Sequence, residues 1–71
     1  MEEKFLSFVA EIMEVDAGEL SLSTTYKEYE KWDSLMMMTL IMELEAEYGV
    51  SIPLEKVNTV STLGDLYQLV Q

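Results

Sequence analysis

The segment "SLMMMTLIMELEAEY", residues 34–48, constrains the fold more than any other part of the chain. Eight of the ten residues from 35 to 44 are apolar, and four of these are methionine. Because Gly49 follows as a C-cap, the segment predicts a helix over residues 34–48. An apolar run this short does not reach the ~20 residues that span a bilayer. We therefore expect a folded domain without membrane insertion.

Apolar side chains fall on two faces of this helix when each residue advances by about 100°. The core-facing sector holds Met37, Leu40, Ile41, Leu44 and Tyr48. A second group lies on another side and consists of Leu35, Met38 and Met42, bordered by Glu43, Glu45 and Glu47. Two interpretations are open for the second group. In the first, its side chains pack against the preceding loop. In the second, they form an exposed surface that binds partners, a role for which flexible methionine side chains are suited.

The rest of the chain predicts three more helices. Residues 2–15 carry apolar side chains at helical spacing and acidic ones on the other side. Pro53 can open a short helical segment over residues 54–58, with Val57 inward. Ser61 or Thr62 can cap a last helix, with Asp65 as the capping-box partner of Thr62. The apolar face of that helix consists of Leu63, Leu66, Tyr67 and Val70, and Gly64 should weaken it slightly.

Residues 16–33 show no sustained period and predict a long loop. The expected anchors of this loop to the core are Leu20, Leu22, Tyr26, Tyr29 and Trp32. The predicted fold is therefore all-α: a small four-helix bundle of long, long, short and medium helices, with a long loop between the first two. With 71 residues, the chain is expected to be a single domain over residues 1–71.

The composition excludes several classes of function. The chain has no cysteine and no histidine, so a Ser–His hydrolase and a cysteine-based zinc site cannot form, and we expect neither an enzyme nor a metal site. Fourteen acidic residues face four lysines, for a net charge of −10. This charge repels nucleic acid and anionic lipid and favours partners with basic patches. Because the first fifteen residues do not form a secretory signal, a cytoplasmic protein is expected. The protein is also expected to be a monomer.

Asp33 and Ser34 stand where the central helix begins, and both are good N-cap residues. Capping explains one of them. It explains neither the apolar group beside Ser34 nor the long loop that precedes it.

The chain resembles the acyl carrier proteins over essentially its whole length. The resemblance rests on "DSL" at 33–35 opening an apolar helix, on "EYGVSIP" at 47–53, and on "VSTLGDLYQLV" at 60–70. It implies a carrier of acyl thioesters with 4′-phosphopantetheine attached to Ser34 by a phosphopantetheinyl transferase. It also implies that Asp33 assists the transferase reaction, through a magnesium ion, and that the thiol of the arm supplies the chemistry that a chain without cysteine lacks.

The resemblance further implies that the central helix is the docking element for acyl-loading and acyl-using enzymes. Leu35, Met38 and Met42 would make the apolar contact, and Glu43, Glu45 and Glu47 would meet basic side chains. A cargo chain sheltered between helices would lie against Met37, Ile41 and Leu44.

The sequence departs from the fatty-acid-synthesis pattern at Trp32, Met36 and Thr39, where that pattern has a small residue and two acids. Fatty acid, polyketide, peptide and surface-sugar or lipid pathways therefore all stay open. The alternative function is a four-helix interaction module that binds a partner through the methionine-rich surface, with Ser34 only an N-cap.

Overall fold

The computed structural model describes residues 2–30 and 32–71; residues 1 and 31, which belong to the predicted domain and loop, lie outside it. The described residues form the helices α1 (Glu2–Met13), α2 (Ser34–Tyr48), α3 (Leu54–Val57) and α4 (Leu63–Val70). Two short 3₁₀ turns, η1 (Ala17–Glu19) and η2 (Tyr26–Glu28), lie in the loop between α1 and α2. No strand occurs among these residues, so the predicted all-α, four-helix architecture is confirmed.

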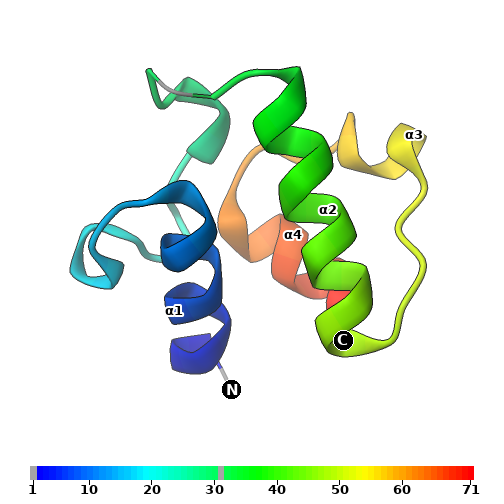
Figure 1. Cartoon of the computed structure of the whole chain (residues 1–71), viewed down its shortest axis with the longest axis horizontal. Coiled ribbons are helices and arrows are strands. Elements are labelled where there is room, and N and C mark those ends of the chain that lie inside the picture. Colours follow the sequence, from blue (N-terminus) through cyan, green and yellow to red (C-terminus); the bar gives the residue numbers. More distant parts are fainter. Residues whose placement is uncertain (1, 31) are drawn as a thin grey trace.

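α1 and α2 run in opposite directions in Figure 1, with α4 behind them and α3 on the side of α2 away from α1. α2 contacts both α1 and α4, and thus forms the centre of the bundle. The core is apolar throughout the described residues. Its largest fully buried side chains are Tyr26, Phe5, Leu40, Leu44, Leu63, Leu66, Val9 and Val57.

α1 ends two residues earlier than the apolar pattern predicts. Glu14 adopts a left-handed conformation with φ of 61°. The N–H of Val15 donates to the carbonyl of Ala10 at 3.0 Å, and the N–H of Glu14 donates to the carbonyl of Glu11 at 3.4 Å. This pair of bonds is a Schellman motif, which closes a helix by satisfying its last carbonyls. The turn brings Val15 back against the core, which explains why an apolar residue follows the end of α1.

The loop before α2 is held by side chains that the sequence identifies as anchors. Leu20 and Tyr26 are buried, and Leu22, Tyr29 and Trp32 are half-buried. The rings of Tyr26 and Trp32 meet edge to face, with centroids 5.0 Å apart. The loop is therefore ordered by its own packing and delivers Trp32 to the start of α2.

The same loop supplies hydrogen-bond acceptors to α4. The N–H of Leu63 donates to the carbonyl of Thr24 at 3.0 Å, and the N–H of Gly64 donates to the carbonyl of Leu22 at 2.7 Å. These first-turn donors have no partner within their own helix. A Cβ on Gly64 would lie 2.9 Å from the carbonyl oxygen of Leu22, so only glycine allows this approach. Gly64 is thus a packing requirement.

Thr62 and Asp65 form the predicted capping box at the start of α4. The hydroxyl of Thr62 accepts the N–H of Asp65 at 3.2 Å, and the carboxylate of Asp65 accepts the N–H of Thr62 at 3.2 Å. That carboxylate also accepts the N–H of Ser61 at 3.1 Å. The N–H groups of Ser61 and Thr62 hold the pKa of Asp65 below its ordinary value. This cap is therefore present at neutral pH and is lost only as the pH falls through the lowered pKa.

Lys27 ties the loop to α3. Its ammonium donates to the carbonyls of Val57 and Val60, both at 2.9 Å. A cation is favourable at a helix C-terminus, where carbonyls lack intrahelical partners. Lys27 therefore holds α3 in place from a position thirty residues earlier in the chain.

The Tyr26→Phe variant is expected to be more stable than the wild-type protein. The side chain of Tyr26 is 1% exposed, and its hydroxyl has no hydrogen-bond partner among the described residues. Removing a buried, unpaired hydroxyl should raise the free energy of unfolding by about 1 kcal/mol. Chemical denaturation at pH 7 would measure this gain. Tyr29→Phe, at a half-buried ring, is the control and should be close to neutral.

In the Tyr26→Phe variant, the free energy of unfolding should fall less steeply above pH 10 than it does in the wild-type protein. Burial, and next the negative charge of Asp65, raises the pKa of Tyr26 to about 12, whereas an unfolded tyrosine has a pKa near 10. Above pH 10 the unfolded chain loses this proton first, so wild-type stability should fall from about pH 10 to pH 12. An equally steep fall in Tyr26→Phe would contradict this assignment.

Candidate functional site

The N-terminus of α2 is capped by Asp33. Asp33 has an extended backbone, and its Oδ1 accepts the N–H of Met36 at 2.8 Å. Its carbonyl accepts the N–H of Met37 at 3.0 Å, the first bond of the helix. Ser34 is the first residue inside α2. The capping role thus belongs to Asp33, and the alternative in which Ser34 serves as the N-cap does not match this geometry.

Ser34 is exposed, and its hydroxyl takes part in no hydrogen bond between described residues. The first N–H groups of a helix have no intrahelical partner, and here the cap satisfies that of Met36. Together with the positive end of the helix dipole, such donors favour an attached or bound phosphate. An accessible hydroxyl at this point is therefore a suitable acceptor for a phosphodiester-linked group.

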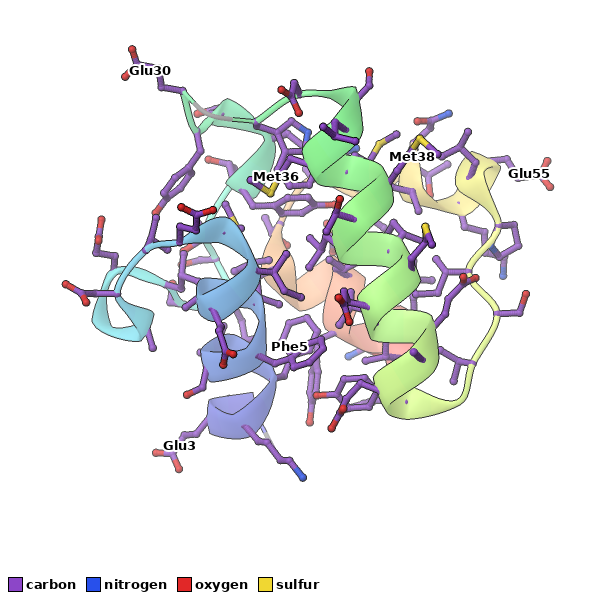
Figure 2. The ribbon with its side chains drawn as sticks, viewed as in Figure 1. Glu3, Phe5, Glu30, Met36, Met38 and Glu55 are labelled. Carbon is purple, nitrogen blue, oxygen red and sulfur yellow. The ribbon has the colours of Figure 1, made fainter. Side chains whose placement is uncertain are left out.

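An exposed apolar strip extends from Ser34 along the outer side of α2. Leu35, Met38 and Met42 are 74%, 56% and 64% exposed, so they do not fill a contact with the loop. Leu54 of α3, at 57%, is a further exposed apolar side chain that the helical pattern did not single out. Figure 2 shows Met38 on the side of α2 that faces α3. We use "exposed strip" for Leu35, Met38, Met42 and Leu54.

The three acidic residues beside the strip differ in their surroundings. Glu43 and Glu47 are exposed on α2. Glu45 is half-buried, and its Oε2 accepts the N–H of Ile52 at 2.7 Å. Glu45 therefore holds the segment between α2 and α3, while the carboxylates of Glu43 and Glu47 face solvent.

Met36 lies apart from both predicted faces of α2, and the structure shows where its side chain packs. It is half-buried and packs on the core from the side opposite Met38 (Figure 2). Met36 lines a hollow of about 230 Å³, the Trp32 hollow. The other residues that border this hollow are Met13, Val15, Glu19, Tyr29, Glu30 and Trp32.

A second hollow, of about 250 Å³, starts at the residues on either side of Ser34. This Asp33 hollow is lined by Ile12, Glu14, Asp33, Leu35, Met36 and Thr39. Neither hollow follows from the helical periodicity, because each is formed by α1 or its end, the loop and the first turns of α2 together.

Within the part of the chain that the structure describes, no three metal-ligating side chains come together. No helix among those residues is both long and apolar enough to cross a membrane.

Comparison with known proteins identifies the family. The model of the phosphopantetheine attachment site matches residues 3–70. The acyl carrier protein of Treponema pallidum (strain Nichols) is 34% identical over 74 residues, which cover 100% of this chain and 95% of that protein. The chain belongs to the acyl carrier protein family. The acyl carrier protein of Tropheryma whipplei (strain Twist) is also 34% identical, over 67 residues that cover 89% of this chain and 82% of that protein.

The solution structure of the holo acyl carrier protein from Geobacter metallireducens has the same fold. The TM-score is 0.79 at 28% sequence identity, with coverage of 97% of this chain and 80% of that chain. The function of this family is to carry acyl groups, and its members are not enzymes. The cofactor is 4′-phosphopantetheine, and partners include a phosphopantetheinyl transferase and acyl-handling enzymes.

Proposed function

We propose that Ser34 carries the 4′-phosphopantetheine arm and that the protein delivers acyl thioesters to enzymes that dock on the exposed strip. The cargo belongs to fatty acid, polyketide or another specialised acyl biosynthesis, and the protein acts as a cytoplasmic monomer with a single domain. The observation that carries the proposal is an exposed, unbonded hydroxyl on the first residue of a helix that its neighbour already caps.

Ser34 contributes the oxygen for the attachment. Its Oγ forms a bond to the phosphorus that bears pantetheine in coenzyme A, the bond from that phosphorus to the bridging oxygen breaks, and 3′-phosphoadenosine 5′-phosphate leaves. The proton of the hydroxyl passes to a base of the transferase or to solvent. The first-turn N–H groups of α2 and the positive end of the helix dipole would favour a phosphodiester attached at Ser34. The terminal thiol of the arm then holds acyl groups as thioesters.

Asp33 has two roles that use different oxygens. Its Oδ1 accepts the N–H of Met36 and fixes the start of α2. Its other oxygen would be available to a Mg²⁺ ion brought with coenzyme A, because Mg²⁺ binds through one or two carboxylates together with substrate phosphates. The carboxylate that caps α2 thus belongs to the residue directly before Ser34 in the chain.

The exposed strip is suited to docking because it is apolar at its centre and acidic at its border. Leu35, Met38 and Met42 offer apolar contact, and Met side chains adapt to several partner surfaces. Glu43 and Glu47 can meet basic side chains directly, whereas Glu45 already accepts the N–H of Ile52 and offers its remaining oxygen. Partners are therefore expected to present an apolar patch flanked by lysine or arginine.

Loading with a phosphopantetheinyl transferase tests the proposed attachment. The protein is incubated with coenzyme A, Mg²⁺ and a broad-specificity transferase, and its intact mass is measured. We expect a gain of one phosphopantetheine, which peptide mapping should locate to the peptide that contains Ser34. A folded protein that gains no mass with several transferases, or that is modified elsewhere, would refute the proposal.

Truncation of the exposed strip should weaken partner binding. In Leu35→Ala and Met42→Ala, the KM of the transferase for the carrier is expected to rise about fivefold or more, because loss of an apolar interface anchor costs about 1 kcal/mol or more. The kcat should change little, since the strip does not touch the reacting atoms. Glu11→Ala, at an exposed position of α1, is the control. An unchanged KM in both strip variants would place docking elsewhere.

A further inference from the structure

α3 is a short helix that packs only lightly on the other helices. It is four residues long, and its N-cap residue, Pro53, makes no side-chain cap bond. A helix of this length is not stable by itself, because helix formation is cooperative and its first turn is costly. α3 also contacts no other helix as extensively as α2 contacts α1 and α4. Its orientation therefore depends on a few anchoring contacts.

These anchors lie within α3 and on either side of it. The side chain of Val57 is 0% exposed and fixes the last turn to the core. Before α3, the carboxylate of Glu45 accepts the N–H of Ile52 at 2.7 Å. At the other end, the ammonium of Lys27 donates to the carbonyls of Val57 and Val60, both at 2.9 Å. Hydrogen bonds from a charged donor are stronger than those between neutral groups, so Lys27 is a main anchor of the C-terminal end of α3.

Lys27 is itself fixed to the loop that leads to Ser34. It is half-buried in η2, and its ammonium lies 6.0 Å from the centroid of the Tyr26 ring, within the range of a cation–π contact. The Tyr26 ring packs edge to face on Trp32, two residues before Ser34. Figure 1 shows η2 and α3 on different sides of α2. Lys27 therefore joins α3 to the segment that ends at the proposed attachment point.

α3 carries one member of the exposed strip. Leu54, 57% exposed, lies on α3 three residues before the buried Val57. Figure 2 shows Met38 on the side of α2 that faces α3. The apolar surface open to a partner thus extends over two helices, and its shape depends on where α3 lies. We propose, on the basis of the proposed docking at the exposed strip, that Lys27 is a positioning residue for partner binding, which holds α3 and with it Leu54 in the arrangement that a docking enzyme meets.

The charge of Lys27 by itself predicts the opposite effect on binding. The chain has a net charge of −10 and is expected to bind basic partners, so losing a lysine should strengthen the electrostatic attraction. Lys56 isolates this effect of charge, because it is exposed on α3 itself. Lys56→Met removes the same charge as Lys27→Met but none of the bonds that Lys27 makes to the end of α3.

Kinetics of phosphopantetheine loading test the positioning role. Lys27→Met removes the ammonium and keeps an unbranched side chain. The KM and kcat of a phosphopantetheinyl transferase are measured for Lys27→Met, Lys56→Met, Leu54→Ala and the double variant of Lys27→Met with Leu54→Ala. Circular dichroism checks that each variant is folded, and amide hydrogen exchange by NMR reports on α3. Lys27→Gln, whose shorter side chain keeps an amide donor, is the second variant if Lys27→Met does not fold.

We expect the KM of Lys27→Met to rise about threefold with kcat unchanged, because α3 is released while the reacting atoms are not touched. Lys56→Met should keep the wild-type KM or lower it slightly. Leu54→Ala should raise the KM less in the Lys27→Met background than in the wild type, because residues that act together are not additive. The amides of Asn58 and Val60, which bond to carbonyls of α3, should exchange faster in Lys27→Met, and those of α2 should not.

Three results would overturn the inference and leave the proposed attachment intact. They are a wild-type KM in folded Lys27→Met, an equal rise of the KM in Lys56→Met, and effects of Lys27→Met and Leu54→Ala that simply add. An unchanged KM in Leu54→Ala would also overturn it, since α3 would then lie outside the docking surface. A wild-type protein that gains no phosphopantetheine would overturn the proposed function and the inference with it.

Discussion

Ser34→Ala is expected to lose phosphopantetheine loading completely and to keep its fold. The variant removes the only atom that the proposed reaction joins to the cofactor, so no residual rate should be measurable by intact mass. The helix should persist because Asp33, through Oδ1, supplies the cap. Alanine also has a slightly higher helix propensity than serine, by a few tenths of a kcal/mol. The thermal midpoint should therefore equal or slightly exceed that of the wild-type apo protein.

The matched control is Ser7→Ala, which removes the exposed serine of α1. It should load as fully as the wild type. If Ser34→Ala still gained one phosphopantetheine, the attachment would lie on another side chain. If Ser34→Ala unfolded, the serine would have a structural role that the observed cap does not predict.

Gly64→Ala is expected to destabilise the protein, although helix propensity alone predicts the opposite. In an ordinary helix interior the change would stabilise by about 1 kcal/mol. Here the new Cβ would lie 2.9 Å from the carbonyl oxygen and 3.3 Å from the Cβ of Leu22. Because the nearest atom is backbone, the loop must move, and the 2.7 Å bond from the N–H of Gly64 to that carbonyl is strained or lost.

We expect a net loss of about 1–3 kcal/mol, the usual cost of forcing extra atoms into a packed contact. In a domain of this size, each kcal/mol lowers the thermal midpoint by about 4–8 °C. Circular dichroism during thermal and urea unfolding would measure the loss. Gly18→Ala is the control, since a Cβ at Gly18 meets nothing within 4 Å, and it should be close to neutral. A Gly64→Ala protein more stable than the wild type would show that the loop yields without cost.

Much of the candidate site could be predicted because it depends on residues close together in the chain. The cap of Asp33 on Met36 and the capping box of Thr62 and Asp65 each span three residues. The two faces of α2 follow from helical geometry alone. The resemblance added the cofactor and the candidate attachment residue, and the family comparison confirmed the carrier class and the cofactor.

Other features required the folded chain because they depend on segments far apart in sequence. The exposure of Leu35, Met38 and Met42 could be decided only once the loop was seen to lie on another side of α2, where Trp32 and Met36 line the same hollow.

The sequence by itself determined the order of the four helices and the two apolar faces of α2, and it reduced the cap of α2 to Asp33 or Ser34, since these follow from short-range hydrogen bonding and from the helical repeat. The tertiary structure alone decided that Gly64 is required, that Lys27 holds α3, that Glu45 binds the N–H of Ile52, and that Met36 lines two hollows. The physical reason is that close approach, burial and cavity shape depend on how separate segments pack against one another, which no local pattern of residue types specifies.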